Sequence, residues 1–286
     1  MTIHTAPSLR GRNPLTENQL RILAPSIFAT EAHHSRSERF SPIPTWNIVQ
    51  ALGREGFVPY RAGQSTTRQP DRTDFTKHLV RFRREDREDL RVDGNIFEIV
   101  LVNGNDGSSA YKLDAGVFRI ACLNGLVVKS QDAGSVRVRH TGNVIDNVIE
   151  GTYQVLDQAE RTLTAAQDWR HKAISRDAQL AFAEEAHTIR FGEEGGAAIQ
   201  PRQLLIARRP GDEGNDLWSA FNRIQENTIR GGLSGYVRNA ETGRRRHTTT
   251  REVRGIDQDQ KVNKALWGIA SLLSERSDLA TVTRGG

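Results

Sequence analysis

A period-two pattern of apolar residues begins at residue 78, with the run His78-Leu79-Val80-Arg81-Phe82-Arg83, and returns in Ile96-Phe97-Glu98-Ile99-Val100-Leu101-Val102. Further runs follow at 117–122, 126–128 and 136–140, and turn formers such as Asp93-Gly94-Asn95 and Asn124-Gly125 separate them. The pattern predicts an antiparallel meander of four or five strands. In the first run Leu79, Arg81 and Arg83 share one side, so we expect one apolar face and one basic face.

The second half of the chain has helical periodicity. Apolar residues recur at three- and four-residue steps from Ile145 to Trp169, which predicts a long amphipathic helix packed on the sheet. Further helices are expected at 175–190, 201–209, 214–230 and 259–275, with a Gly- and Arg-rich loop between the last two. The fold class is therefore α+β: an antiparallel β-meander packed by a long helix and followed by a helical C-terminal half.

The predicted organisation is one domain with two flexible ends. Residues 1–44 contain several prolines and little periodicity, which indicates a flexible N-terminal arm with one short helix. Thr45 resembles an N-cap for a helix that leads into an extended run at 57–60. We expect a single α+β domain over 45–275, sheet-rich at 57–140 and helical at 143–275, and a flexible tail over 276–286.

Composition excludes several classes of protein. No run among the 286 residues approaches the roughly 18 apolar residues of a membrane span, and the N-terminus lacks the apolar region of a signal peptide. Cys122 is the single cysteine, so the chain forms no internal disulfide and no multi-cysteine zinc site. Its apolar neighbours indicate a small buried side chain rather than a reactive thiol. A soluble, cytoplasmic protein without a membrane partner is expected.

The choice of basic residue is more informative than the net charge. The formal charge of +5 is modest, but arginine supplies 34 of the 40 basic residues and lysine only six. The planar guanidinium group suits phosphate, carboxylate and stacking on bases. A biased genomic base composition would enrich arginine equally well, and the count alone leaves both explanations open.

The common catalytic motifs are missing from the sequence. It has no phosphate-binding G-x-x-x-x-G-K-[ST], no G-x-G-x-x-G opening a helix, no H-E-x-x-H and no G-x-S-x-G. The Asn/Gly-rich run at 103–109 is most simply a hairpin loop, and its spacing does not match a calcium-binding loop. We therefore expect no cofactor and no metal, and we assign no catalytic residue.

The densest basic cluster lies in the loop between the last two predicted helices. Arg244-Arg245-Arg246 is followed by Arg251 and Arg254, with Tyr236 upstream, and this composition suits phosphate backbones and stacked bases. A solvated loop explains it equally well. The full set of candidate nucleic-acid-binding residues joins this cluster to the basic strand positions: Lys77, Arg81, Arg83, Arg119, Arg139, Arg244, Arg245, Arg246, Arg251 and Arg254.

Several motifs occur in an order that resembles a known family. They include Phe118-Arg119-Ile120-Ala121-Cys122-Leu123-Asn124-Gly125-Leu126 and, later, Phe221-Asn222-Arg223-Ile224-Gln225-Glu226-Asn227 followed by Gly231-Gly232. Together with 77–83, 103–109, 139–141, 251–257 and 263–267, they resemble the phage- and plasmid-related family catalogued as a domain of unknown function, the nine-three-two family. The resemblance covers roughly 45–275. It implies an association with prophages, plasmids and other mobile elements, and no established catalytic residues.

Three functions compete. The favoured hypothesis is a nucleic-acid-binding protein of mobile DNA, with single-stranded DNA as partner, which resembles single-strand annealing or recombination factors in its order of elements and forms a homo-oligomer. The second is an enzyme acting on nucleic acid or nucleotides through Lys77, His78, Arg119 and His140. The third is an interaction protein that blocks a host defence factor, for which the sequence has no positive mark. Fold order alone does not establish function.

Overall fold

The computed structural model describes residues 13–30, 44–104, 109–120, 124–127, 135–139, 142–192, 198–238 and 242–282. The chain divides into two compact units, residues 1–163 and 164–286, where the sequence suggested a single domain. The boundary lies within helix α4 (Ala159–His171), so no linker rich in proline or glycine marks it in the sequence. Cys122 and His140, for which the sequence made predictions, lie outside the described residues.

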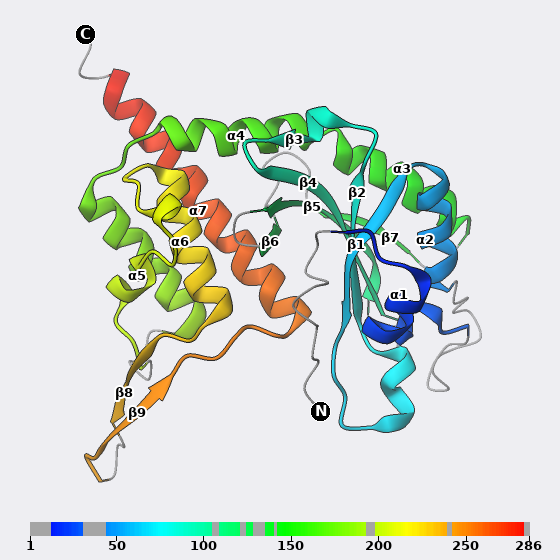
Figure 1. Ribbon diagram of the computed structural model, residues 1–286, viewed down its shortest axis with the longest axis horizontal. Coiled ribbons are helices and arrows are strands. Elements are labelled where there is room, and N and C mark those ends of the chain that lie inside the picture. Colours follow the sequence, from blue (N-terminus) through cyan, green and yellow to red (C-terminus); the bar gives the residue numbers. More distant parts are fainter. Residues whose placement is uncertain are drawn as a thin grey trace. The chain divides into compact units, whose positions relative to one another are not determined.

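The first unit is built on an antiparallel sheet (Figure 1). Its central strands follow the order β1 (Phe57–Gln64), β2 (His78–Arg84), β4 (Asn95–Gly104) and β5 (Ser109–Arg119). The short strands β6 (Asn124–Val127) and β7 (Val136–Val138) pair with different parts of β5, and β3 (Arg91–Val92) pairs with β4. The predicted meander is confirmed, and the fold is α+β.

Two strand boundaries differ from the prediction. β5 begins at Ser109, inside the segment expected to be a hairpin loop, because its first residues pair with β4 and β7. Asn124 and Gly125, expected to form a turn, instead pair with Arg119 and Phe118 as the start of β6. Local turn formers are outweighed here by pairing with a neighbouring strand.

Two helices cover one face of this sheet. α2 (Thr45–Arg54) lies beside β1, and α3 (Val144–Leu156) packs on β5 and β7. Gly151 allows this approach, because a Cβ atom there would lie 2.8 Å from Val136 Cγ1 and 2.9 Å from Leu113 Cδ1. Thr45 is the first residue of α2 rather than its N-cap, and its buried hydroxyl lies 2.9 Å from His78 Nε2 and accepts from Asn103 Nδ2 at 3.0 Å.

Part of the expected N-terminal arm is folded. Residues 13–30 contain α1 (Glu17–Leu23), which begins with a capping box at Thr16, and the 3-10 helix η2 (Pro25–Phe28). Leu20 and Ile27 are buried, and the Leu15 amide donates to the carbonyl of Pro59 in β1 at 2.7 Å. The short apolar stripe is enough to hold this segment on the sheet.

The long helix predicted from 145 to about 170 is two helices. α3 ends at Leu156, and α4 begins at Ala159 after a turn in which the amide of Gln158 donates to the carbonyl of Val155. The apolar spacing of three and four residues continues across this two-residue break, so the sequence pattern does not reveal it.

The second unit is mainly helical. It contains most of α4, then α5 (Arg176–Phe191), α6 (Leu217–Arg230) and α7 (Ile256–Val282), with the 3-10 helices η5 (Pro201–Leu205) and η6 (Pro210–Asp212) before α6. Only η5 stands where a helix over 201–209 was expected. Trp169, Trp218, Phe221 and Trp267 form its aromatic core, with Trp169 and Trp267 ring centroids 4.4 Å apart.

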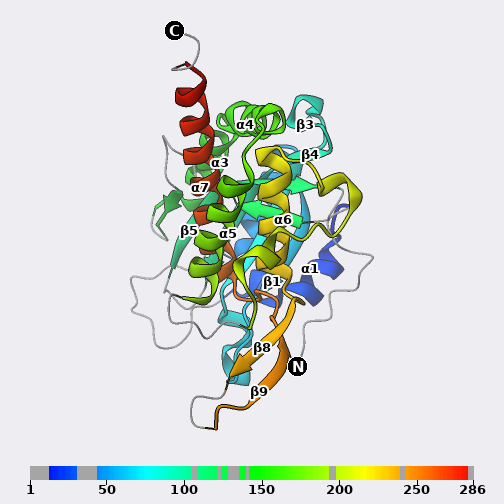
Figure 2. The same ribbon diagram turned by 90° about the vertical axis from the view of Figure 1, so that its left-hand side faces the viewer.

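A two-stranded ribbon replaces the loop predicted between the last two helices. β8 (Ser234–Arg238) and β9 (Arg245–Thr249) pair along their whole length and extend away from α5 and α6 in both views (Figures 1 and 2). The predicted tail is shorter, because α7 continues to Val282.

Candidate nucleic-acid interface

The β8–β9 ribbon presents the basic cluster found in the sequence. Arg244, Arg245 and Arg246 are all exposed at the start of β9, and Arg251 and Arg254 are exposed just after it. Within the described part of the chain, no carboxylate forms an ion pair with Arg244, Arg245 or Arg246, whereas Arg254 lies 3.7 Å from Glu252. The ribbon therefore holds at least three guanidinium groups in contact with solvent.

One face of the ribbon combines aromatic and basic side chains. Tyr236 pairs directly with His247, and their rings lie edge to face with centroids 5.4 Å apart. The Arg245 guanidinium lies 4.8 Å from the centroid of the Tyr236 ring. Tyr236 is 55% exposed in the middle of its strand. Such a ring contributes little to a core, and it is available to a ligand.

The opposite face of the ribbon is closed at its base. A Cβ atom on Gly235 would lie 1.7 Å from the carbonyl oxygen of Ala198, so only glycine fits at this position. The neighbouring amide of Tyr236 donates to the same carbonyl at 2.9 Å. The ribbon is thus docked on the segment before η5 through one face and leaves the Tyr236 face open.

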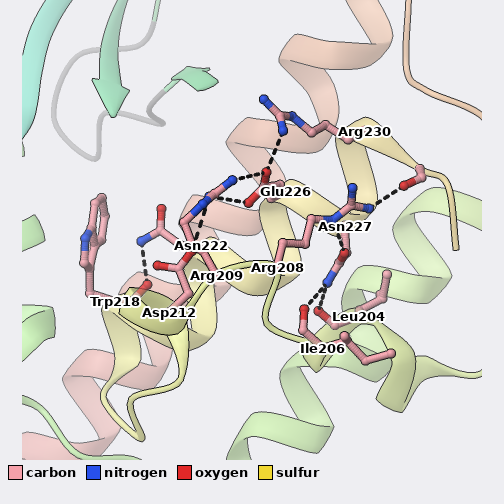
Figure 3. A network of polar contacts seen from close by, with 11 residues as sticks. Leu204, Ile206, Arg208, Arg209, Asp212, Trp218, Asn222, Glu226, Asn227 and Arg230 are labelled. Carbon is pink, nitrogen blue, oxygen red and sulfur yellow. Dashed lines mark hydrogen bonds and ion pairs between the residues drawn. The ribbon is translucent and has the colours of Figure 1, made fainter. Parts of the chain in front are cut away.

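Arginine side chains fix both strands of the ribbon at the end of α6. Arg208 Nε donates to Asn227 Oδ1 at 2.7 Å, and its Nη2 donates to the carbonyl of Gly231 (Figure 3). Burial lowers the pKa of Arg208, although the nearby Glu226 carboxylate opposes this shift. Arg190 Nη2 donates to the carbonyl of Arg251 at 3.1 Å. These cations position backbone and are not presented to a ligand.

α6 supplies the polar network behind this anchor. Glu226 is buried between two arginines, with Arg209 Nη1 at 2.6 Å and Arg230 Nη1 at 2.9 Å from its carboxylate oxygens (Figure 3). Asn227 Nδ2 donates to the carbonyls of Leu204 and Ile206 at 2.9 and 2.8 Å. The polar residues of this helix are structural.

The motif residues Asn222, Gln225 and Glu226 are buried in this helix. Asn222 Nδ2 donates to the carbonyl of Trp218, and Gln225 Nε2 donates to Asn263 Oδ1 at 2.9 Å. Arg223, from the same motif, donates from Nη2 to Gln179 Oε1 at 2.8 Å, and burial lowers its pKa. These contacts join α6 to α5 and α7.

The basic sheet face expected from Arg81 and Arg83 is not a binding surface. Both side chains are buried and share the carboxylate of Glu98, with Arg81 Nη1 2.9 Å from Oε2 and Arg83 Nε 2.8 Å from Oε1. Arg83 is also stacked between Tyr60 and Phe118, at 4.2 and 4.1 Å from their ring centroids. Two of the predicted contacts with nucleic acid are therefore internal ion pairs.

The remaining strand candidates are dispersed. Arg119 is buried at one end of β5, Lys77 is half-buried before β2, and Arg139 is exposed after β7. Arg119 pairs with Asn95 and His78 with Asn103, so eight residues of β4, about 27 Å, separate these two ends of the sheet.

The catalytic group proposed in the alternative enzyme hypothesis is not assembled. His78 is fully buried, with Nδ1 3.0 Å from Ser26 Oγ and Nε2 2.9 Å from Thr45 Oγ1. Its ring joins η2 and α2 to the sheet. His78 and Arg119 are at opposite ends of the sheet, and neither is on a surface where substrate could bind.

The sequence pattern identified Tyr236 and the arginines of this ribbon, but His247 was not among the predicted site residues. The signal was available in the alternation Tyr236-x-Arg238 before Gly243 and Arg245-x-His247 after it. Gly243, between the two strands, has a positive φ of 66°, a backbone conformation that glycine adopts without steric cost.

Among the described residues, no three histidine, cysteine or acidic side chains gather as a metal site. The described helices likewise include none with the length and apolar character needed to cross a membrane.

Fold and site together define an α+β protein that carries an exposed basic β-ribbon. Residues 32–267 match the family model described as "Domain of unknown function (DUF932)", and the chain belongs to this family. It is 45% identical to UPF0380 protein YfjQ and 44% identical to UPF0380 protein YafZ, both of Escherichia coli (strain K12). Each alignment spans 266 residues and 93% of both chains. No solved structure matches the chain.

Proposed function

We propose that the protein binds nucleic acid, with single-stranded DNA as the favoured partner, through the β8–β9 ribbon. The observation that carries this proposal is the exposure of Arg244, Arg245 and Arg246 beside an exposed tyrosine, without carboxylate partners in the described chain. Guanidinium groups bind phosphate through paired hydrogen bonds, and aromatic rings accept stacked bases. The buried arginines of the sheet are not part of this site.

The biological setting follows from the resemblance. A role in phage- or plasmid-type mobile DNA is the setting that the resemblance of the motifs implies. A role like that of single-strand annealing or recombination factors is supported by a sheet and helices combined with a basic contact element. Both proposals concern the biological process that the protein serves, and both require that the ribbon binds DNA.

Salt dependence of binding tests the proposal. Replacing Arg244, Arg245 and Arg246 with alanine should reduce the slope of log affinity against log salt concentration, because fewer counterions are released on binding. The reduction should correspond to the loss of up to about three phosphate contacts. The measurement is an electrophoretic or anisotropy titration with single-stranded DNA at several salt concentrations.

A matched control removes the same charge elsewhere. It replaces three exposed arginines of the first unit with alanine, at positions Arg54, Arg68 and Arg72. The control should keep the wild-type slope. Equal slopes for the two triple variants would remove the ribbon from the site, and absence of binding by the wild-type protein at low salt would remove the proposal.

A further inference from the structure

The ribbon has one open face, and its composition is unusual for a solvent-exposed strand. Tyr236, Arg245 and His247 share this face, since Tyr236 and His247 are direct partners and Arg245 lies two residues from His247 on β9. The Tyr236 ring is 55% exposed, and its partners in the described structure, His247 and Arg245, belong to the same ribbon and leave much of the ring in solvent. A ligand with its own flat apolar surface would cover it at the smallest cost in desolvation.

The state of the bases decides which nucleic acid suits the open face. In a double helix the flat faces of the bases are covered by neighbouring base pairs, and only the base edges are exposed in the grooves. The Tyr236 ring could not stack on such a base, and the opposite face of the ribbon is occupied at the ribbon base by the backbone of Ala198. A single strand needs only one face, with its phosphates beside basic side chains and its bases turned toward the protein.

We infer that the open face is a stacking site for unpaired nucleic-acid bases, with the Tyr236 ring as platform and Arg245 beside it to pair with phosphate. This inference rests on the proposed function and narrows it to bases that are not paired. Because every base has a π-face, such a site recognises single strands without reading their sequence.

The His247 ring contributes to the platform as well as Tyr236. It lies edge to face against the tyrosine, 5.4 Å between centroids, and this contact holds the Tyr236 ring at a fixed angle to the strands. The Arg245 guanidinium lies over the same ring, 4.8 Å from its centroid, so it places a positive charge within reach of the phosphates of a strand whose base stacks on the other face of the ring. The charge complements phosphate and the ring complements the base.

Removing the ring and removing the bases test the inference together. The full-length wild-type protein and its Tyr236→Leu and Tyr236→Phe variants are titrated with an oligothymidylate of about 16 nucleotides, and with a strand of equal length whose sugars carry no bases. Tyr236→Leu should weaken binding to the oligothymidylate by about 5- to 150-fold, the range measured for loss of one base–aromatic stack. It should leave binding to the abasic strand unchanged, and Tyr236→Phe should behave as wild type.

Tyr153→Leu is the matched control, because Tyr153 is another exposed tyrosine, at 37%, and lies on α3 outside the ribbon. It should bind both strands as the wild-type protein does. A Tyr236→Trp variant adds a direct signal: the fluorescence of the new indole should be quenched by the oligothymidylate and not by the abasic strand.

The outcomes separate the inference from the function on which it rests. If Tyr236→Leu weakens binding to both strands equally, or to neither, the stacking site is refuted while nucleic-acid binding stands. Binding to duplex DNA alone would refute it in the same way. If the wild-type protein binds no nucleic acid at low salt, the proposed function fails, and the inference fails with it.

Discussion

Glu98 lies between two buried guanidinium groups and shows how charge is accommodated inside the sheet. Arg81 and Arg83 reach it from the neighbouring strand, and the stack of Arg83 between two aromatic rings offsets part of the cost of removing that cation from water. The nearby Tyr60 is buried as well, which, together with its hydrogen bond to Glu85, raises its pKa to about 12. The cluster is therefore held by ion pairs and ring contacts inside the sheet.

Replacing Glu98 with glutamine should lower the free energy of unfolding by about 3–5 kcal/mol, because two buried cations lose their shared counter-charge. Chemical denaturation measures this directly. The control is Glu17→Gln, which breaks the exposed pair between Glu17 and Arg21 on α1 and should change stability little. Similar losses in the two variants would show that the buried cluster is solvated.

The ion pairs of this cluster could not be predicted from the sequence. Strand parity correctly placed Arg81 and Arg83 on one side, but their partner is on another strand, 15 residues away from Arg83. Burial of a charge depends on such non-local pairing, which no local pattern contains. Arginines that look like a binding face were therefore assigned to the surface.

The ribbon is the element that the sequence did not predict. Its strands are short and polar, with Val237 and Tyr236 the main strand-forming residues of β8, so propensity is weak. The central strand β4, with a continuous run of buried residues, was predicted without difficulty. What stabilises the ribbon is docking of its backbone on distant segments, at Ala198 and at the end of α6, and this contact has no signature in the sequence.

Gly235 should be essential for that docking. Gly235→Ala places a methyl group within 1.7 Å of the Ala198 carbonyl oxygen, so the ribbon must leave its support while the helices keep their own contacts. We expect faster tryptic cleavage after the arginines of β9, mapped by mass spectrometry, with an unchanged helical circular dichroism signal.

Gly211→Ala is the appropriate comparison, since this exposed glycine of the same unit has no atom within 4 Å of an added Cβ and does not have a positive φ. It should be cleaved at the wild-type rate. Equal cleavage of the Gly235 variant would mean that the backbone contact at Ala198 does not hold the ribbon.

At the scale of the whole molecule, one ribbon contacts only a few nucleotides, and a single-strand-binding protein gains affinity by placing several such sites along one strand. We therefore expect the protein to assemble on long single-stranded DNA. Mass photometry should detect particles whose mass rises in steps of the 31.9 kDa chain as the DNA lengthens. Monomers alone at micromolar concentration, with and without DNA, would count against an annealing function.

The buried polar side chains of α6 have a consequence for how the second unit forms. Asn227 and Arg223 require the carbonyls of Leu204, Ile206 and Gly214, and Gln225 requires Asn263 on α7. A helix buried before those partners arrive would leave amides and guanidinium groups without water or protein acceptors, at a cost of about 1–3 kcal/mol for each group. We therefore expect this unit to assemble in an all-or-none transition, in which α6 joins the folded state together with its neighbours rather than ahead of them.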